Sequence, residues 1–250
     1  MPDLLAAGFW GLVSGSALLV GAFLAYAVPL PRRAIAAAMA FGAGVLISAL
    51  SFDLMEEAFE RGGFLSCAAG FVGGAALYTG ASLLLARGAK HRKRSGGPPA
   101  SAPEDEGANG LAITIGTLID GIPESVAIGL TLVEGGVVSA PAVVAIFLSN
   151  VPESLSASLG LRRSGHRARS VFALWITSIA VFALAAMAGY GLFAGLPEEI
   201  VAATTAVAAG GILAMVTDTM IPEAFEVAHD FAGLITVAGF LTAFALTKLA

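Results

Sequence analysis

Long uninterrupted runs of apolar residues fill most of the chain, and short clusters of charge, proline or glycine separate them. The charge-free runs are roughly 15 to 28 residues long, and an apolar helix of about 20 residues crosses the hydrocarbon core of a bilayer. The runs are continuous rather than alternating in ten-residue segments, which argues against an outer-membrane barrel. The pattern therefore predicts an all-α polytopic membrane protein. Eight transmembrane helices are expected, near residues 4–28, 34–58, 64–87, 110–133, 139–161, 170–194, 199–223 and 231–249.

The composition agrees with this prediction. Hydrophobic residues make up 57% of the 250 residues, and charged residues make up 12%, about half the usual share of ~25%. At about 20 residues per helix, eight helices with short loops use the whole chain. We therefore expect residues 1–250 to form a single transmembrane domain, without a separate soluble domain.

Basic residues gather on alternate loops. With the N-terminus outside, 11 of the 13 Lys and Arg residues fall on the inner side, and only Arg61 and Lys248 fall on the other. Because Lys and Arg are enriched on the cytoplasmic side, this bias predicts a multi-pass protein of the inner or plasma membrane with both termini extracytoplasmic. The first basic residue is Arg32, so no cleaved signal peptide is expected. The long connection 88–108 is basic, then rich in Gly, Pro and Ser, then acidic, and is predicted to be a disordered cytoplasmic loop.

The chain also contains an internal repeat. Residues 43–60 and 209–226 agree at six of 18 positions without a gap, at an offset of 166. The same offset carries helix 1 onto helix 6, so helices 1–3 are expected to repeat as helices 6–8, inverted in the membrane, around central helices 4 and 5. Chance similarity between apolar segments is the alternative. Inverted repeats are typical of secondary transporters, whose sites lie near mid-membrane on broken helices.

Helices 4 and 5 carry polar side chains near the middle of the membrane. Counting 1.5 Å per residue places Asp120 and Glu124 roughly 15 and 21 Å from the inner end of helix 4. Asn150 and Glu153 lie roughly 17 and 12 Å from the inner end of helix 5. A central acid that faces lipid costs on the order of 2.5 to 3.5 kcal/mol, so these side chains are expected to face a polar interior. Ser149 shares a helix face with Glu153.

A proline adjoins the acid in each of these helices. Pro123 and Pro152 each remove one helical hydrogen bond and free a carbonyl oxygen, although a packing kink is the alternative use of either proline. Carboxylates held this close repel one another unless a cation lies between them. Oxygen ligands suit Mg, Ca or Mn, admit Fe and Zn, and match Cu(I) poorly. The predicted ligands of a divalent cation are Asp120, Glu124, Asn150 and Glu153, with Ser149 as a weaker candidate.

Further acids lie toward the helix ends. Asp53 and Glu57 lie in the outer part of helix 2, and Asp218 and Glu223 lie in the inner part of helix 7. Since the repeat pairs Glu57 with Glu223, we expect the first two to receive the ion from outside and the last two to release it inside. Acids that merely meet water at the membrane surface are the alternative.

These residues give the sequence a resemblance to the ZIP (Zrt/Irt-like) metal-ion transporters over nearly the whole chain. The helix 4 signature of the family, His-Asn-x-Pro-Glu-Gly, falls on residues 120–125, and its helix 5 counterpart, His-Glu-x-Pro-x-Gly, falls on residues 149–154. A Pro-Glu pair is present in both segments. The histidines are not: Asp120 and Ser149 occupy their positions, and Asp53 stands where many members have a helix 2 histidine.

The resemblance implies eight helices with external termini, one or two metal ions held by helices 4 and 5 with help from helix 2, and metal uptake into the cytoplasm. It also implies an elevator-like shift of helices 1, 4, 5 and 6 against a scaffold of helices 2, 3, 7 and 8, often in a homodimer. Without imidazole ligands, the site is expected to discriminate less sharply for zinc and to admit Mn, Fe or Cd more readily.

The predicted function is a divalent metal-ion uptake permease of the zinc, iron or manganese class, and not an enzyme. No permanent cofactor is expected, because the metal ion is the transported substrate, and the expected surroundings are the lipid bilayer rather than nucleic acid. A proton or monovalent-cation carrier stays open, since carboxylates alone serve proton relays. An intramembrane aspartyl protease using Asp120 and Asp218 is a weaker alternative, because the chain has no Gly-x-Gly-Asp sequence.

Overall fold

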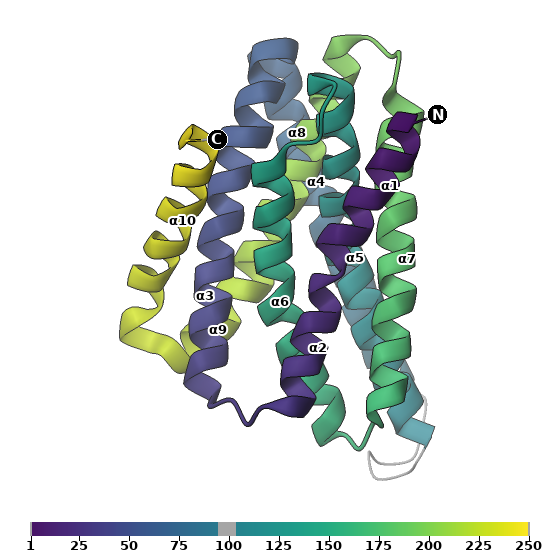
Figure 1. Ribbon diagram of the computed structural model, residues 1–250. Helices are drawn as coiled ribbons and strands as arrows, with labels where there is room; N and C mark the ends of the chain where they lie inside the picture. Colours follow the sequence, from purple (N-terminus) through teal and green to yellow (C-terminus); the bar gives the residue numbers. More distant parts are fainter. Residues whose placement is uncertain (1, 95–103, 250) are drawn as a thin grey trace.

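The computed structural model describes residues 2–94 and 104–249. Within these residues every regular element is a helix, which confirms the all-α prediction. In chain order (Figure 1) the elements are α1 (Pro2–Gly15), α2 (Ala17–Ala27), α3 (Arg32–Ala49), the π-helix η1 (Leu50–Met55), α4 (Glu56–Arg94), α5 (Glu104–Gly135), α6 (Ala140–Arg163), α7 (Ala168–Phe193), α8 (Glu198–Met215), the π-helix η2 (Val216–Met220), α9 (Ile221–Ala228), the 3₁₀-helix η3 (His229–Phe231) and α10 (Ala232–Leu249).

Six helical segments of the described residues are long and apolar enough to cross a membrane, which supports a multi-pass membrane protein. Four of them are 20 to 26 residues long, close to the number that one crossing requires. The segments Arg32–Leu85 and Glu198–Leu249 have 54 and 52 residues, more than twice that number. The sequence predicts eight separate spans, whereas the structure joins the second to the third and the seventh to the eighth.

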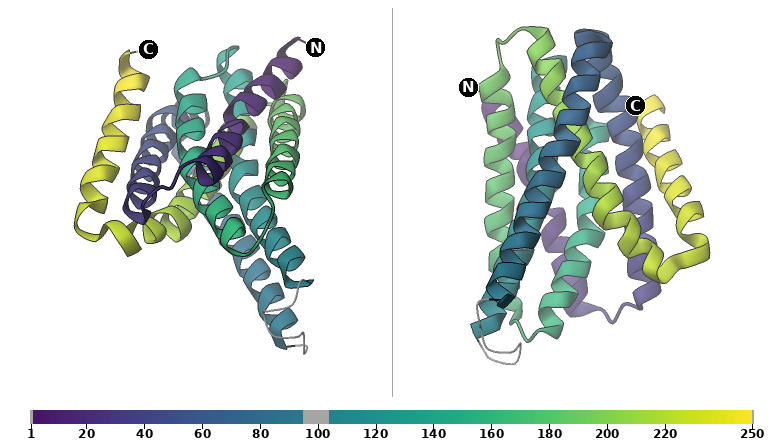
Figure 2. Two further views of the ribbon diagram at one scale, coloured as in Figure 1. Left: turned by 60° about the horizontal axis from the view of Figure 1, so that its bottom comes forward. Right: turned by 180° about the vertical axis from the view of Figure 1, so that it is seen from behind.

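Each of the two long segments folds back on itself at one residue. Gly63 has φ 70 and ψ 176 inside α4, a conformation that glycine adopts readily because it has no Cβ. His229, at the end of α9, has φ 35 and is the one non-glycine residue with positive φ in the described part of the chain. Figure 1 and Figure 2 show that the chain reverses at both places, so that α10 runs back beside α3.

The start of α1 and the end of α10 lie at one end of the molecule, here named the terminal end, and the end of α4 and the start of α5 lie at the other, named the loop end (Figure 1). Disorder is expected over 88–108, yet α4 continues to Arg94 and α5 begins at Glu104. The ends of that stretch are rich in Ala, Lys, Arg and Glu, which favour helix and extend the neighbouring spans. The remaining positions, 95–103, lie outside the described residues.

The element boundaries follow the offset of the sequence repeat. α3 begins at Arg32 and ends at Ala49, and α8 begins and ends 166 positions later, at Glu198 and Met215. The π-helices η1 and η2 then follow at the same offset, and so do the two reversals of the chain. π-Bulges of this kind occur frequently at functional sites. The two stretches therefore share local structure as well as sequence.

The helices form two groups, and the most extensive helix contacts fall within a group. The first bundle consists of α1, α2, α5, α6 and α7, and the second bundle consists of α3, α4, α8, α9 and α10 with the short elements η1, η2 and η3. In the rear view of Figure 2, α4 and α8 of the second bundle cross one another. The two bundles meet where α3 packs on α6 and where α5 packs on α8.

Helices approach one another more closely inside a bundle than between bundles. Gly74 of α4 faces the carbonyl of Val207 in α8, and Gly129 of α5 faces the carbonyl of Ala186 in α7, so closely that a Cβ at either glycine would clash with backbone. Between the bundles, a Cβ at Gly211 of α8 would lie 3.8 Å from the ring of Pro123, an ordinary contact. The boundary between the bundles therefore depends more on side chains than on backbone contact.

Candidate functional site

The two Pro-Glu-Ser motifs adopt the same local structure in α5 and α6. Pro123 and Pro152 both lie inside their helices. The hydroxyls of Ser125 and Ser154 donate to the carbonyls four residues earlier, at 2.7 and 2.8 Å. Because proline has no N–H, the carbonyl four residues before each proline also lacks its usual helical donor. Each motif thus combines an acid with a carbonyl oxygen that is free to bind another group.

Glu124 is a fully buried carboxylate without a hydrogen-bond partner. It is 1% exposed, and neither carboxylate oxygen accepts a hydrogen bond from the described residues. Asn150 of α6 is 2% exposed, and its Nδ2 has no partner there either. An uncompensated buried charge costs several kcal/mol, so the Glu124 carboxylate requires a proton or a cation.

Asp120 and Glu153 extend this acidic group. The carboxylate of Glu153 lies within electrostatic range of Asp120, Glu124 and Glu223, and Glu124 lies within range of Asp120. The hydroxyl of Tyr78 in α4 donates to Asp120 Oδ1 at 2.8 Å. Sequence reasoning missed Tyr78. The available signal was a tyrosine inside an apolar run, where a hydroxyl must find a partner.

Ser149, the weaker candidate, is fully buried, and its hydroxyl donates to the carbonyl of Ile146 at 2.9 Å. Its oxygen lone pairs stay available to a cation. Gly42 of α3 allows the second bundle to approach here, since a Cβ at Gly42 would lie 3.2 Å from Ser149 Cα. The face of α6 that carries Ser149 and Glu153 is therefore turned toward the boundary between the bundles at this point.

The acids do not form a tight cluster. Over residues 2–94 and 104–249, no three His, Cys, Asp or Glu side chains lie close enough together to hold one metal ion. In this conformation at most two acids can share an ion, and its other ligands would come from Asn150, Ser149 or the carbonyls that the prolines free.

The four acids near the helix ends lie in different surroundings. Asp53, in η1, accepts a hydrogen bond from Thr247 at 3.3 Å. Glu57 pairs with Arg61 at 3.1 Å, toward the terminal end. Asp218, in η2, and Glu223, in α9, are both exposed.

Of these four acids, only Glu223 comes within electrostatic range of Glu153, and it accepts a hydrogen bond from Ser156 of α6. Sequence reasoning did not single out Ser156.

A cavity of about 330 Å³ lies beside this group, between α4, α5 and α8. Its lining includes Tyr78, Ile122, Pro123, Thr204 and Gly211. The walls are almost entirely apolar. The cavity therefore suits hydrocarbon better than a hydrated cation, and we do not assign it to ion binding.

In the comparison with known proteins, no protein-family model matches the chain, and no curated protein matches it.

Proposed function

We propose that the protein is a divalent metal-ion uptake permease in which Asp120, Glu124, Asn150 and Glu153 bind the transported ion, with Ser149 as an additional oxygen ligand. The observation that carries this proposal is Glu124, whose buried oxygens have no hydrogen-bond partner and lie within electrostatic range of Asp120. A divalent cation would neutralise two such carboxylates at once. Oxygen ligands alone favour Mn, Fe or Mg over a strict preference for zinc, while zinc remains a substrate that carboxylates can bind.

The proposal includes eight membrane crossings. The reversals at Gly63 and His229 would divide each of the two long apolar segments into two crossings, and four single crossings complete the set. The basic residues of the described chain also support one orientation. Arg32, Arg162 and Arg167 lie at helix ends of the loop end, so this end would face the cytoplasm and both termini would lie outside.

The mechanism that we propose is alternating access between the two bundles. An inverted repeat is supported by the matching boundaries of α3 with α8 and of η1 with η2. The first bundle carries both Pro-Glu motifs, on α5 and α6. At its boundary with the second bundle, a Cβ at Gly42 would lie 3.2 Å from Ser149 Cα, whereas a Cβ at Gly74, inside the second bundle, would clash with backbone. Movement of the first bundle would carry the ion from the terminal end toward the loop end, as the resemblance to ZIP transporters implies.

An inner path continues from this site. Glu153 lies within electrostatic range of both Glu124 and Glu223, and Glu223 is exposed toward the loop end. An ion released from Glu124 would therefore find Glu153 and then Glu223, with Ser156 positioning the last carboxylate through its hydrogen bond. Asp53 and Glu57 would receive the ion from outside, on the opposite side of the site.

Uptake by reconstituted variants tests the proposal. Glu124→Gln and Glu153→Gln remove one charge each with almost no change in side-chain volume. We expect both proteins to insert normally and to lose Mn²⁺, Fe²⁺ and Zn²⁺ influx in proteoliposomes by at least about tenfold, or about 1.4 kcal/mol. Glu198→Gln, at an exposed acid that begins α8, is the matched control and should keep wild-type influx. Wild-type influx by both site variants would refute the assignment.

A proton or monovalent-cation carrier is the second candidate, because the unpartnered carboxylate of Glu124 could equally be neutralised by a proton. The same proteoliposomes separate the two functions. A carrier of protons would acidify the lumen without any divalent metal, whereas the proposed permease requires the metal.

A further inference from the structure

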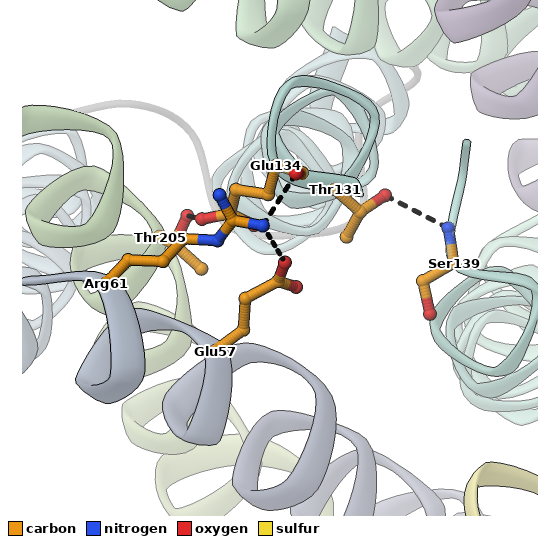
Figure 3. Close-up of polar contacts among 6 residues, drawn as sticks. All are labelled: Glu57, Arg61, Thr131, Glu134, Ser139 and Thr205. Atoms are coloured by element: carbon orange, nitrogen blue, oxygen red, sulfur yellow. Dashed lines mark hydrogen bonds and ion pairs between the residues drawn. The ribbon is translucent and has the colours of Figure 1, made fainter. Parts of the chain in front are cut away.

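A cluster of four polar residues lies at the terminal end, outside the proposed metal site. We name it the terminal lock: Glu57 and Arg61 of α4, Glu134 of α5 and Thr205 of α8 (Figure 3). Arg61 Nη2 donates to Glu57 Oε1 at 3.1 Å and to the backbone carbonyl of Glu134 at 2.6 Å. Thr205 Oγ1 donates to Glu134 Oε1 at 2.6 Å. Three helices are therefore joined through three side chains, those of Arg61, Glu134 and Thr205, and one backbone carbonyl.

The lock connects the two bundles. Arg61 and Thr205 belong to the second bundle, and Glu134 belongs to the last turn of α5 in the first. Glu134 is 8% exposed, and its Oε2 has no hydrogen-bond partner in the described chain. Its backbone and its carboxylate are each held by a different helix of the second bundle. If the bundles move apart at this end, all of these hydrogen bonds to Glu134 must break together.

Among the described residues, the loop-end positions that the repeat pairs with this lock lack its cation. At the repeat offset of 166, Glu57 corresponds to Glu223, but Arg61 corresponds to Val227. Glu223 accepts a hydrogen bond from Ser156, and the ion pairs between described side chains are confined to Arg61 with Glu57 and Lys248 with Glu56. The repeat thus provides a cationic side chain that bridges the bundles at one end and an apolar side chain at the other.

We propose that Arg61, Glu57, Glu134 and Thr205 form a lock that holds the first bundle against the second at the terminal end, so that the boundary between them stays closed from this side until the lock opens. The guanidinium of Arg61 lies between the carboxylate of Glu57 and the carbonyl of Glu134, and in this position it closes the boundary to water. That the lock controls access to the metal site rests on the proposed function; that it closes the boundary between the bundles does not.

The test measures how fast a thiol at this boundary reacts with a water-soluble maleimide. Cys67 is the only cysteine, so Cys67→Ala gives a thiol-free background. Ala127→Cys then places a reporter on α5, roughly 10 Å below Glu134, in the buried cluster that it shares with Ala208 of α8. The full chain is reconstituted in nanodiscs, where both faces are accessible and the result does not depend on membrane orientation.

Removing either donor should open the boundary. We expect Arg61→Ala and Thr205→Val to raise the labelling rate of the reporter by about tenfold, and Arg61→Lys, which keeps the charge without the forked guanidinium, to raise it less. Lys248→Ala is the matched control. It removes a basic residue at the same end, but its ion pair with Glu56 joins α10 to α4 inside the second bundle, and the labelling rate should not change.

Labelling of Arg61→Ala and Thr205→Val at the parental rate would overturn the lock. If Arg61→Ala does not fold, Thr205→Val decides alone, because it removes one hydroxyl and little volume. An equal rise in Lys248→Ala would also refute the proposal, since a general loss of charge would then be the cause. If the variants show the expected change in labelling rate but the protein transports no metal ion, the proposed function is refuted and the proposed lock is not.

Discussion

The close contact between α4 and α8 makes a specific prediction for two neighbouring glycines. A methyl group at Gly74 would lie more than about 1 Å closer to the carbonyl oxygen of Val207 than van der Waals contact allows. The atom is backbone, so no side chain can turn aside, and the two helices have to separate. At Gly73, one residue earlier on the same helix, an added methyl group would meet no atom within 4 Å. The two positions differ only in the direction that they face.

The expected effects have opposite signs. Overpacking of this kind costs about 1 to 3 kcal/mol, so Gly74→Ala should destabilise the protein by that amount. Gly73→Ala should stabilise it by about 0.5 to 1 kcal/mol, because alanine favours helix over glycine. At roughly 2 to 4 °C per kcal/mol, the melting temperatures of the two variants should differ by on the order of 3 to 16 °C.

Thermal unfolding of the purified variants in one detergent, followed by loss of the monodisperse peak in size-exclusion chromatography, measures this difference. Unfolding in detergent is commonly irreversible, so both variants are heated at one rate and compared with the parent. A Gly74→Ala protein that melts at or above Gly73→Ala would refute the contact between α4 and α8. Gly210→Ala, which places a methyl group against the carbonyl of Phe71 from the other helix, should behave as Gly74→Ala does.

Two further predictions concern hydrogen bonds of single side chains. Tyr78→Phe removes the hydroxyl that donates to Asp120. It should lower the melting temperature of the metal-free protein by an amount equivalent to about 1.5 to 3 kcal/mol. An unchanged melting temperature would mean that this hydrogen bond contributes nothing to stability. Arg162→Ala removes a guanidinium that donates to the carbonyl of Ala25 at 2.7 Å and lies 5.5 Å from the centre of the Tyr26 ring. It should lower the melting temperature, and Arg162→Lys should lower it less. Arg163→Ala, at an exposed position, should melt at the parental temperature. Equal effects at 162 and 163 would contradict these contacts of Arg162.

The positions of the membrane-crossing helices follow from the sequence to within a few residues. The expected run 139–161 becomes α6 at Ala140–Arg163, and the expected run 170–194 becomes α7 at Ala168–Phe193. This agreement has a simple physical cause, because the bilayer fixes the length of an apolar helix and charge or proline fixes its ends. The extension of α4 to Arg94 was missed, since a polar helix that continues a span has no boundary in hydropathy.

The candidate site was predictable only in part. The Pro-Glu motifs identified Glu124 as a costly acid inside a span, and its burial without a partner agrees with that reasoning. Tyr78 and Thr205 could not be placed beside Asp120 and Glu134, because they lie on helices more than 40 residues away in the chain. Glu134 falls just outside the expected run 110–133, whereas in the structure it is buried in the last turn of α5.

The sequence by itself determined that the chain is helical, roughly where its apolar spans lie, and which acids are expensive to bury. These properties depend on local composition and on the thickness of a bilayer, and both can be evaluated one segment at a time. The tertiary structure decided which helices pair, and therefore that Arg61 meets Glu134 and that Glu153 comes within range of Glu223. Helix pairing depends on how small residues such as Gly74 and Gly129 let backbones approach, and that fit exists only when both surfaces are in place.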